Sequence, residues 1–233
     1  DLVRSRGLGD VYKRQGNAES LLSLRVPVAI HSDLETTRKW CSLPHGILYV
    51  CHVASKREIE FLKSEDVKIE VTPHHLFLIR NDDPLSRVKP ALGTEDDRRA
   101  LWANLNRIDI IASDHAPHTL EEKMEGACGI AGTETMLPLL LNALDKGVIT
   151  LQDIALKLSE NPSTLLNSLL NFRKGFFVGA DADFTVVDLK KQWTIRASEF
   201  HSKANHSPFD GWRIRGRVLK TILRGNTIYE ADV

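Results

Sequence analysis

Short apolar runs alternate along the chain, from Arg25 onward, with stretches in which apolar positions recur at helical spacing. Four apolar runs have the length of buried strands: Val26–His31, Gly46–Val53, Val67–Thr72 and Ile108–Ser113. Helices are predicted between and after them: Leu34–Cys41, Lys56–Ser64, Glu95–Leu105, Thr133–Lys146 and Leu151–Ser159. The pair Asn161-Pro162 predicts that the last helix stops there. Strands that alternate with helices favour βα units and a parallel α/β sheet.

The pattern changes after Gly175, where β-like runs follow one another without helices between them. These runs are Phe177–Leu189, Arg217–Leu223 and Asn226–Glu230. The pair Gly225-Asn226 predicts a tight turn between the last two runs, as in a hairpin. We therefore predict two units, an α/β unit over residues 16–175 and an all-β unit over residues 176–233.

Residues 1–15 fit neither unit. Ser5–Gln15 reads SRGLGDVYKRQ, which looks like the in-frame translation of a transposase-type sequencing adapter. The segment also lacks the apolar core of a secretory signal. We therefore exclude residues 1–15 from the fold prediction and expect the native sequence to begin near Gly16.

The composition excludes several classes of protein. The 233 residues carry 31 Lys plus Arg and 31 Asp plus Glu, so the formal net charge is zero. A general binder of nucleic acid or anionic membranes would have a basic excess, and no apolar run approaches the ~18 residues needed to cross a bilayer. Three cysteines are too few for a disulfide framework and suggest a reducing compartment, so we expect a cytoplasmic protein.

Histidines cluster in the α/β part, where seven of the nine lie between His31 and His118. Reactive side chains recur at the carboxyl end of each predicted strand: His31; Cys51 and His52; Glu70, His74 and His75; Asp114 and His118. In a (β/α)8 barrel this is the face on which active sites lie. Imidazole and carboxylate ligands on separate strands suit zinc in an open, catalytic site.

One motif is far more specific. Ala112–Lys123 reads ASDHAPHTLEEK, which resembles the second signature of dihydroorotases and matches it at every fixed position. The stretches VCHVASKRE, EVTPHHLFL, VKPALGTEDDR and SPFDGW are also similar to that family, and the resemblance extends over residues 24–233. Dihydroorotases are amidohydrolases, and the chain resembles those of the animal multifunctional pyrimidine-synthesis protein and its bacterial relatives.

The resemblance implies a fold and a reaction. The fold is a (β/α)8 TIM barrel with a small β-sandwich, of which this chain would hold about strands 5–8 of the barrel and part of the sandwich. The reaction is the reversible cyclisation of N-carbamoyl-L-aspartate to L-dihydroorotate in pyrimidine synthesis, catalysed by a hydrolase with two zinc ions. The family's first-strand motif, His-x-His, does not occur in the sequence. We therefore expect the remaining zinc ligands upstream of this chain, and expect the chain alone to be inactive.

The resemblance also assigns roles residue by residue. It makes His31, His52 and Asp114 zinc ligands, and Asp114 the catalytic general acid and base as well. His118 would bind the substrate carboxylate. Lys89 stands where close relatives have an arginine that contacts the substrate, so the charge is kept but the planar fork is lost.

Further residues have supporting roles in the resemblance. Ala131 and Gly132 match a loop that contacts the substrate through its backbone, although relatives have proline at the position of Ala131. Cys51, Glu70 and His75 are candidates for supporting the metal ligands. Each has an alternative: Cys51 packs in the core, Glu70 is structural, and His75 packs or caps.

Two other functions stay open. One is that of a different cyclic amidohydrolase: an allantoinase, a hydantoinase or a dihydropyrimidinase. The other is a non-catalytic, dihydroorotase-like scaffold that associates with a carbamoyltransferase. The expected partner is the small-molecule substrate rather than a nucleic acid or a membrane, and both a homodimer and an association with aspartate carbamoyltransferase are compatible with the resemblance.

Overall fold

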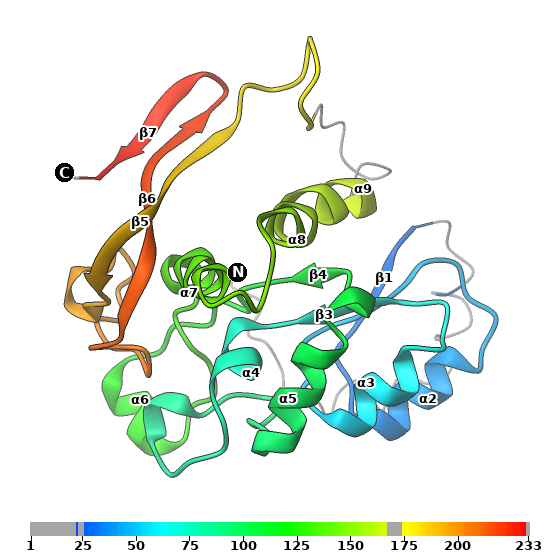
Figure 1. Ribbon diagram of the computed structural model, residues 1–233. Helices are drawn as coiled ribbons and strands as arrows, with labels where there is room; N and C mark the ends of the chain where they lie inside the picture. The colour runs from blue at the N-terminus through cyan, green and yellow to red at the C-terminus, as the bar shows by residue number, and fades with distance from the viewer. Residues whose placement is uncertain (1–21, 23–25, 167–173, 232–233) are drawn as a thin grey trace, which may run out of the picture.

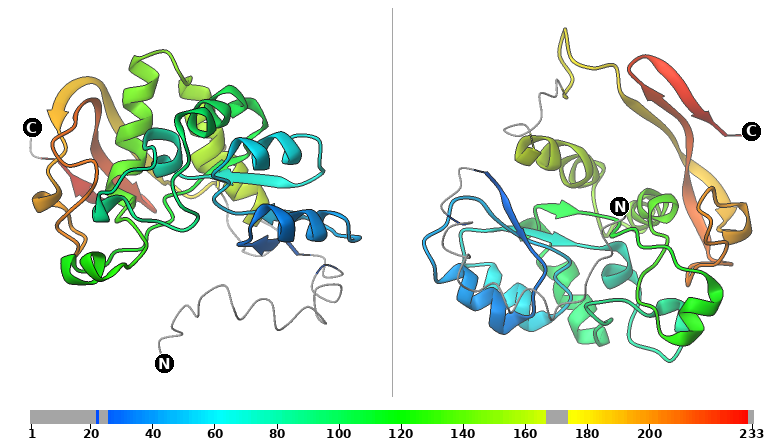
Figure 2. Two further views of the ribbon diagram at one scale, coloured as in Figure 1. Left: turned by 90° about the horizontal axis from the view of Figure 1, so that it is seen from below. Right: turned by 180° about the vertical axis from the view of Figure 1, so that it is seen from behind.

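The computed structural model describes Leu22, residues 26–166 and residues 174–231. The adapter-like residues 1–15 lie outside the described part. Within it the strands form a four-stranded sheet and a three-stranded sheet. Helix α7 (Thr133–Asp145) lies between the two sheets (Figures 1 and 2).

The four-stranded sheet is parallel throughout, and its strands lie in chain order. They are β1 (Val28–Ile30), β2 (Leu48–Val50), β3 (Lys68–Val71) and β4 (Ile110–Ile111). Each strand falls inside one of the predicted apolar runs, so the prediction of βα units with a parallel sheet is confirmed. Because the strands all run the same way, their carboxyl ends meet at one edge of the sheet, where open α/β sheets bind ligands.

Helices connect the strands, and several begin at a capping residue that the sequence supplies. Besides α7 they include α2 (Leu34–Cys41), α3 (Lys56–Leu62), α4 (Pro73–Phe77), α5 (Glu95–Ala103), α6 (Leu120–Glu125) and α8 (Leu151–Ala155). Ser55 and Glu58 form a capping box at the start of α3, and Thr94 and Asp97 form another at α5. Among the described residues, no helix is long and apolar enough to cross a membrane.

The prediction that the last helix of the α/β part stops at Asn161-Pro162 is wrong. After α8, a π-helical turn (η4, Leu156–Glu160) leads directly into a further helix, α9 (Asn161–Leu166). Pro162 is the second residue of α9. Proline is tolerated there, because in the first turn of a helix the N–H that proline lacks has no partner within that helix.

The three-stranded sheet is antiparallel, with strands β5 (Phe184–Thr194), β6 (Arg213–Leu223) and β7 (Asn226–Glu230) in that order. Leu223 pairs with Asn226, so the turn consists of Arg224 and Gly225, with φ values of 49° and 80°. Two positive φ values are typical of a type I′ hairpin. The predicted hairpin is therefore confirmed, with its turn one residue earlier than expected.

The predicted ends of these strands are less accurate. β5 begins at Phe184 rather than Phe177 and runs on to Thr194, and β6 begins at Arg213 rather than Arg217. Residues 177–183 are turns and irregular backbone, and no strand in the described part of the chain pairs with them. The boundary between two units near residue 176 stays a prediction.

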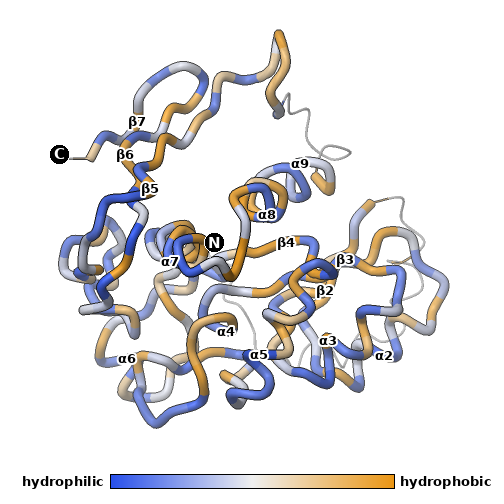
Figure 3. Tube along the Cα trace, viewed as in Figure 1, coloured by the Kyte–Doolittle hydropathy of each residue, from blue (hydrophilic) through white to orange (hydrophobic). Residues whose placement is uncertain are grey.

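Two apolar clusters hold these layers together. The larger one packs the parallel sheet against its helices and includes Leu48, Ile69 and Leu101, all fully buried. The smaller one includes Leu139 of α7 and Phe209, and it joins α7 to the antiparallel sheet and its loops. Apolar positions along the strands and α7 appear as orange segments in Figure 3.

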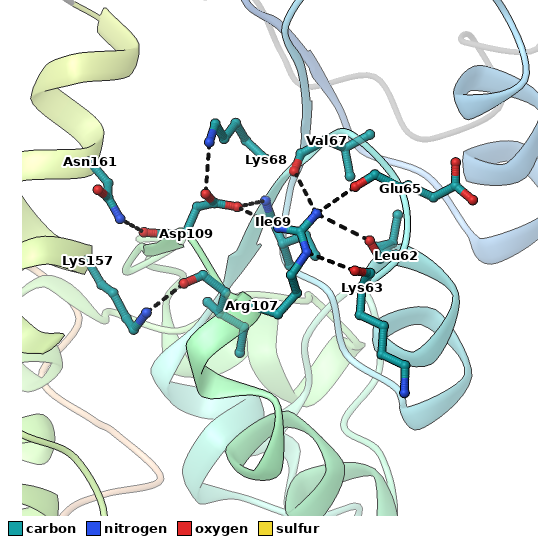
Figure 4. Close-up of polar contacts among 11 residues, drawn as sticks. Leu62, Lys63, Glu65, Val67, Lys68, Ile69, Arg107, Asp109, Lys157 and Asn161 are labelled. Carbon is teal, nitrogen blue, oxygen red and sulfur yellow. Dashed lines mark hydrogen bonds and ion pairs between the residues drawn. The ribbon is translucent and has the colours of Figure 1, made fainter.

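A polar cluster closes the amino-terminal ends of β3 and β4 (Figure 4). The Arg107 guanidinium donates hydrogen bonds to four backbone carbonyls at and after the end of α3: Leu62, Lys63, Glu65 and Val67. The Asp109 carboxylate accepts the backbone N–H of Ile69 at 2.9 Å and the Lys68 ammonium at 3.0 Å. Lys157 donates to the Ile108 carbonyl at 2.6 Å, which attaches η4 to this end of the sheet. These contacts satisfy backbone groups that would otherwise be orphaned where α3 and the strands end.

The contact between α7 and β6 predicts a stability difference between two glycines. A Cβ atom at Gly216 (φ 98°) would lie 2.4 Å from Cβ of Leu141, whereas one at Gly225 (φ 80°) would meet nothing within 4 Å. Gly225→Ala therefore adds only backbone strain, about 1 kcal/mol, and Gly216→Ala adds a steric clash and should cost about 3 kcal/mol or more. Equilibrium urea unfolding of both variants measures the difference. Equal losses would show that α7 does not pack on Gly216 as described.

Candidate active site

Two of the predicted site residues have an unusual backbone conformation. His52 lies two residues after the end of β2 and has a φ of 40°. Asp114 lies three residues after the end of β4 and has a φ of 45°. Non-glycine residues adopt positive φ at a cost of about 1–3 kcal/mol, and they keep it only where the surroundings enforce it. Such residues gather at functional sites, so the carboxyl edge of the parallel sheet is a candidate functional site.

A histidine pair lies at this edge. Nδ1 of His31, after β1, and Nε2 of His52, after β2, are 2.8 Å apart, and the ring centroids are 4.8 Å apart. His52 is buried and its Nδ1 has no hydrogen-bond partner, while His31 is exposed. Burial lowers the pKa of His52, and the neighbouring His31 adds to this effect. The imidazole of His52 is therefore held in the neutral form that binds metal ions.

The histidine pair opens into a cavity of about 570 Å³. Its lining residues come from the ends of β1 and β2, the starts of α2 and α3, and the loop after α4: His31, Ser32, Asp33, Leu34, Thr36, His52, Ser55, Arg57, Glu58, Lys89 and Pro90. The structure thus brings the predicted ligands His31 and His52 together with the predicted substrate residue Lys89. Arg57 adds a second cation that the sequence did not single out, because an arginine in the first turn of a surface helix has no distinguishing pattern.

Glu70 fixes the backbone of His52. This strand-interior carboxylate is 7% exposed; its Oε1 accepts the His52 N–H at 3.0 Å, and its Oε2 accepts the Tyr49 hydroxyl. Burial raises the pKa of Glu70, and the bonds from Tyr49 and His52 oppose that rise. Tyr49 was not predicted. The signal that could have identified it is the parallel register, which pairs Tyr49 with Lys68 and so brings it beside Glu70.

Cys51 lies next to this group, fully within the core. Burial, and then the charges of Glu70 and Asp114, raise the pKa of its thiol to about 12. The thiol therefore stays protonated at neutral pH, and only the thiolate is a good metal ligand. This placement agrees with the core-packing alternative, and a supporting role for Cys51 stays a prediction.

His75 connects the end of β3 to the cavity wall. Its Nε2 donates to the carbonyl of Pro90 at 3.0 Å, so Nδ1 is left to accept the Thr72 hydroxyl at 2.7 Å. Both nitrogens are thus occupied, and His75 holds the residue that follows Lys89. The adjacent His74 is 2% exposed and its Nε2 has no hydrogen-bond partner.

Asp114 and the loop opposite it complete the edge. The negative charge of Asp114 raises the pKa values of His52, Cys51 and Glu70. Gly132 packs directly on this segment, because a Cβ atom there would lie 2.6 Å from the Ser113 carbonyl. Ala131 and Gly132 are both buried. The predicted loop residues therefore pack beside the predicted general acid and base.

His118 lies apart from the cavity. Its Nε2 donates to the Cys128 carbonyl at 3.1 Å, and its Nδ1 is 3.4 Å from a carboxylate oxygen of Glu122. His118 does not line the cavity of the histidine pair, and neither do Asp114, Ala131 or Gly132. Binding of a substrate carboxylate by His118 stays a prediction.

The fit to a metal ion is partial. Within the described ranges, no group of three His, Cys, Asp or Glu side chains is arranged to hold a metal ion. The histidine pair nevertheless has one feature of a metal site, because two ring nitrogens, Nδ1 of His31 and Nε2 of His52, converge. Two imidazole nitrogens on one tetrahedral zinc lie about 3.3 Å apart, close to the spacing seen here.

Comparison with known proteins accounts for the motifs. No protein-family model matches the chain. Dihydroorotase from Pyrococcus furiosus is 48% identical over 238 residues, covering 100% of this chain and 57% of the relative. Dihydroorotase from Pyrococcus horikoshii is 49% identical over 211 residues, covering 88% of this chain and 49% of the relative. The chain is homologous to dihydroorotases. It spans about half the length of these curated relatives.

Two further proteins, one a sequence relative and one a solved structure, are similar to this chain. The multifunctional protein CAD of Squalus acanthias is 36% identical over 222 residues, which cover 88% of this chain and 9% of that protein. Among solved structures, L-hydantoinase from Arthrobacter aurescens is 30% identical with a TM-score of 0.74 over 79% of this chain and 45% of its own. This dihydroorotase homologue therefore shares the fold of a little under half of this hydantoinase.

A second solved structure has a similar fold. It is described as an inactive dihydroorotase-like domain of the CAD-like multifunctional protein of Chaetomium thermophilum. It is 22% identical with a TM-score of 0.65, and the match covers 86% of this chain and 57% of that domain. At this identity the match shows a shared fold alone, so the scaffold alternative stays open.

The buried histidine of the cavity wall predicts a pH dependence of stability. Burial lowers the pKa of His75 from 6.5 to about 4. Between these values the unfolded chain binds a proton at His75 that the folded chain does not, so the contribution of His75 to stability falls with pH from about 6.5 to about 4, by up to about 3 kcal/mol, and levels off below. Urea unfolding at pH 7, 5.5 and 4 measures this loss. His75→Gln should remove that part of the pH dependence; an unchanged profile in the variant would contradict it.

Proposed function

We propose that this chain supplies half of the active site of a dihydroorotase, which interconverts N-carbamoyl-L-aspartate and L-dihydroorotate. The observation that carries the proposal is the convergence of His31 and His52 at 2.8 Å, in a cavity that also contains Lys89. Sequence identity of 48% to a dihydroorotase over the whole chain supports it. The histidines occupy neighbouring parallel strands, which is the arrangement that an open metal site requires.

In this proposal the four parallel strands are strands 5–8 of a (β/α)8 barrel. β1 and β4 lie at the two borders of the sheet, where further parallel strands can join. The antiparallel strands β5, β6 and β7 belong to the small β-sandwich. The other barrel strands and the His-x-His motif come from a part of the protein outside this chain, which is why the chain alone is expected to be inactive.

Zinc is the metal that the donor set favours. His31, His52 and Asp114 would hold it, since neutral imidazole and carboxylate are its usual ligands in catalytic sites. When bound, zinc lowers the pKa of a coordinated water to about 7 and so makes hydroxide available. Two zinc ions per complete site, with the remaining ligands upstream, are part of the proposal.

The residues of this chain have separate tasks in the reaction. The Asp114 carboxylate takes the proton of the attacking water and delivers it to the leaving ring nitrogen, and it reverses these transfers in the biosynthetic direction. His118 binds the substrate carboxylate, and the Lys89 ammonium contacts the substrate as a point charge rather than a bidentate fork. Backbone groups of Ala131 and Gly132 contact the ring. Glu70 and His75 position His52 and the Lys89 segment.

The surroundings of the enzyme follow from the relatives and the composition. A relative named as the multifunctional protein CAD supports an association with a carbamoyltransferase, either in the same chain or between chains. A homodimer is the alternative assembly. Cys41, Cys51 and Cys128 are all free thiols, which agrees with a cytoplasmic location.

Activity on a substrate panel tests the proposed function. The complete protein, in which this chain is joined to the segment that carries the first-strand ligands, should hydrolyse L-dihydroorotate faster than hydantoin, allantoin or dihydrouracil. Asp114→Asn should lower kcat by about 10²–10⁴-fold, because proton transfer is lost. His31→Ala should also lose zinc, measured by elemental analysis, and His45→Ala, outside the cavity, serves as the control.

Each alternative has its own outcome in this experiment. Preference for hydantoin, allantoin or dihydrouracil would assign the chain to another cyclic amidohydrolase. A folded, zinc-loaded protein with no turnover of any substrate in the panel would favour the non-catalytic scaffold. Turnover of dihydroorotate by residues 16–233 alone would contradict the expectation that half of a site is inactive.

A further inference from the structure

The lysine of the signature motif has a buried ammonium that the proposed chemistry does not use. Lys123, in α6, has no solvent-exposed surface. Its Nζ donates to the carbonyl of Arg87 at 2.8 Å and to the carbonyl of Gly129 at 2.9 Å. In the described part of the chain, no carboxylate lies within ion-pair distance of this ammonium. Two carbonyl dipoles therefore hold the charge.

The two carbonyls belong to segments that lead into the candidate site. Arg87 precedes Lys89 by two residues, and Gly129 precedes Ala131 and Gly132. The segments also bond directly to each other, because the Gly129 N–H donates to the Arg87 carbonyl at 2.9 Å. The Arg87 guanidinium in turn donates to the Lys123 carbonyl at 3.3 Å. Lys123 thus lies where the loop before Lys89 meets the loop before α7.

The loop before α7 is also held against the motif itself. The Ala116 N–H donates to the Ile130 carbonyl at 3.0 Å, and a Cβ atom at Gly129 would lie 2.4 Å from the Ala116 carbonyl. On the other side of Lys89, the ring of His75 donates to the Pro90 carbonyl at 3.0 Å. Lys89 therefore extends from a short segment that is fixed before it by Lys123 and after it by His75.

We propose that Lys123 is a positioning residue for substrate binding. Its ammonium holds the Lys89 segment and the Ala131–Gly132 backbone in one fixed relation, so that both can contact the same substrate. Lys123 does not touch the substrate. The inference rests on the proposed function, because it assigns a substrate contact to each of those segments. An apolar side chain in place of the ammonium would leave the buried Gly129 carbonyl without its hydrogen bond and the Arg87 carbonyl with the Gly129 N–H alone.

Lys157 offers a matched control. It is also a buried lysine whose ammonium donates to a backbone carbonyl, that of Ile108 at 2.6 Å. Ile108 precedes β4, so Lys157 lies at the end of the sheet opposite the candidate site (Figure 4). Loss of either ammonium should weaken the fold, but only loss of the Lys123 ammonium should disturb substrate binding.

The test compares Lys123→Met with Lys157→Met in the complete protein. Lys123→Met should raise KM for L-dihydroorotate about tenfold or more and leave kcat within about threefold, as expected when binding common to substrate and transition state is lost. Lys157→Met should keep KM within about twofold. Hydrogen exchange should accelerate at the amides of residues 88–89 and 130–132 in Lys123→Met alone. Lys123→Gln, which keeps an N–H donor, replaces the methionine variant if that variant does not fold.

The outcomes separate this inference from the proposed function. An unchanged KM in the Lys123 variant, or an equal rise in the Lys157 variant, would overturn the positioning role while the wild type still turns over dihydroorotate. An inactive wild type would overturn the proposed function instead. In that case hydrogen exchange still decides whether Lys123 holds the two segments, and unchanged exchange in the Lys123 variant would overturn the inference.

Discussion

A buried carboxylate is the constraint on which the candidate site depends. Glu70 lies inside a strand, where an isolated charge would cost several kcal/mol, and it is stabilised there by hydrogen bonds from the His52 N–H and the Tyr49 hydroxyl. The same bonds hold β2 and β3 together at the point where their regular pairing ends. Because the His52 N–H must face Glu70, the chain turns through a positive φ, and the ring of His52 is directed toward His31. The hydrogen bonds of Glu70 therefore both join β2 to β3 and fix the position of His52.

The two ends of the parallel sheet are built differently. At the amino-terminal end, the side chains of Arg107, Asp109 and Lys157 form hydrogen bonds mainly with backbone groups, so these polar side chains already have partners. At the carboxyl end, by contrast, His52 and His74 each keep a buried ring nitrogen without a partner. This division agrees with the general division of barrels into a stabilising face and a reactive face. The two buried lysines differ in the same way: Lys123 bonds to loops that lead into the candidate site, whereas Lys157 bonds to backbone at the opposite end of the sheet.

The repetition of strands and reactive residues along the sequence was enough to predict the parallel sheet and to place His31, His52 and Asp114 at one edge. The alternation of strands and the capping residues of helices depend only on neighbouring positions, so a single sequence is enough to identify them. Lys89 and the histidine pair share a cavity that the motif comparison only implied. The hydrogen bond between Tyr49 and Glu70 depends on strand register, and the contacts of Lys123 depend on loop packing, so neither could be predicted from spacing. The helix after Pro162 was missed because a proline in a first turn and a proline that ends a helix look alike in sequence.

Helix α7 has a position that links the two sheets mechanically. It is 13 residues long, about 20 Å, and it begins immediately after Gly132, which packs on Ser113 beside Asp114. Nine residues later, Leu141 packs on Gly216 of β6. Helix α7 therefore contacts the segment beside Asp114 at its start and β6 in its second half. The antiparallel sheet is consequently connected, through this one helix, to the edge of the parallel sheet on which the histidine pair lies.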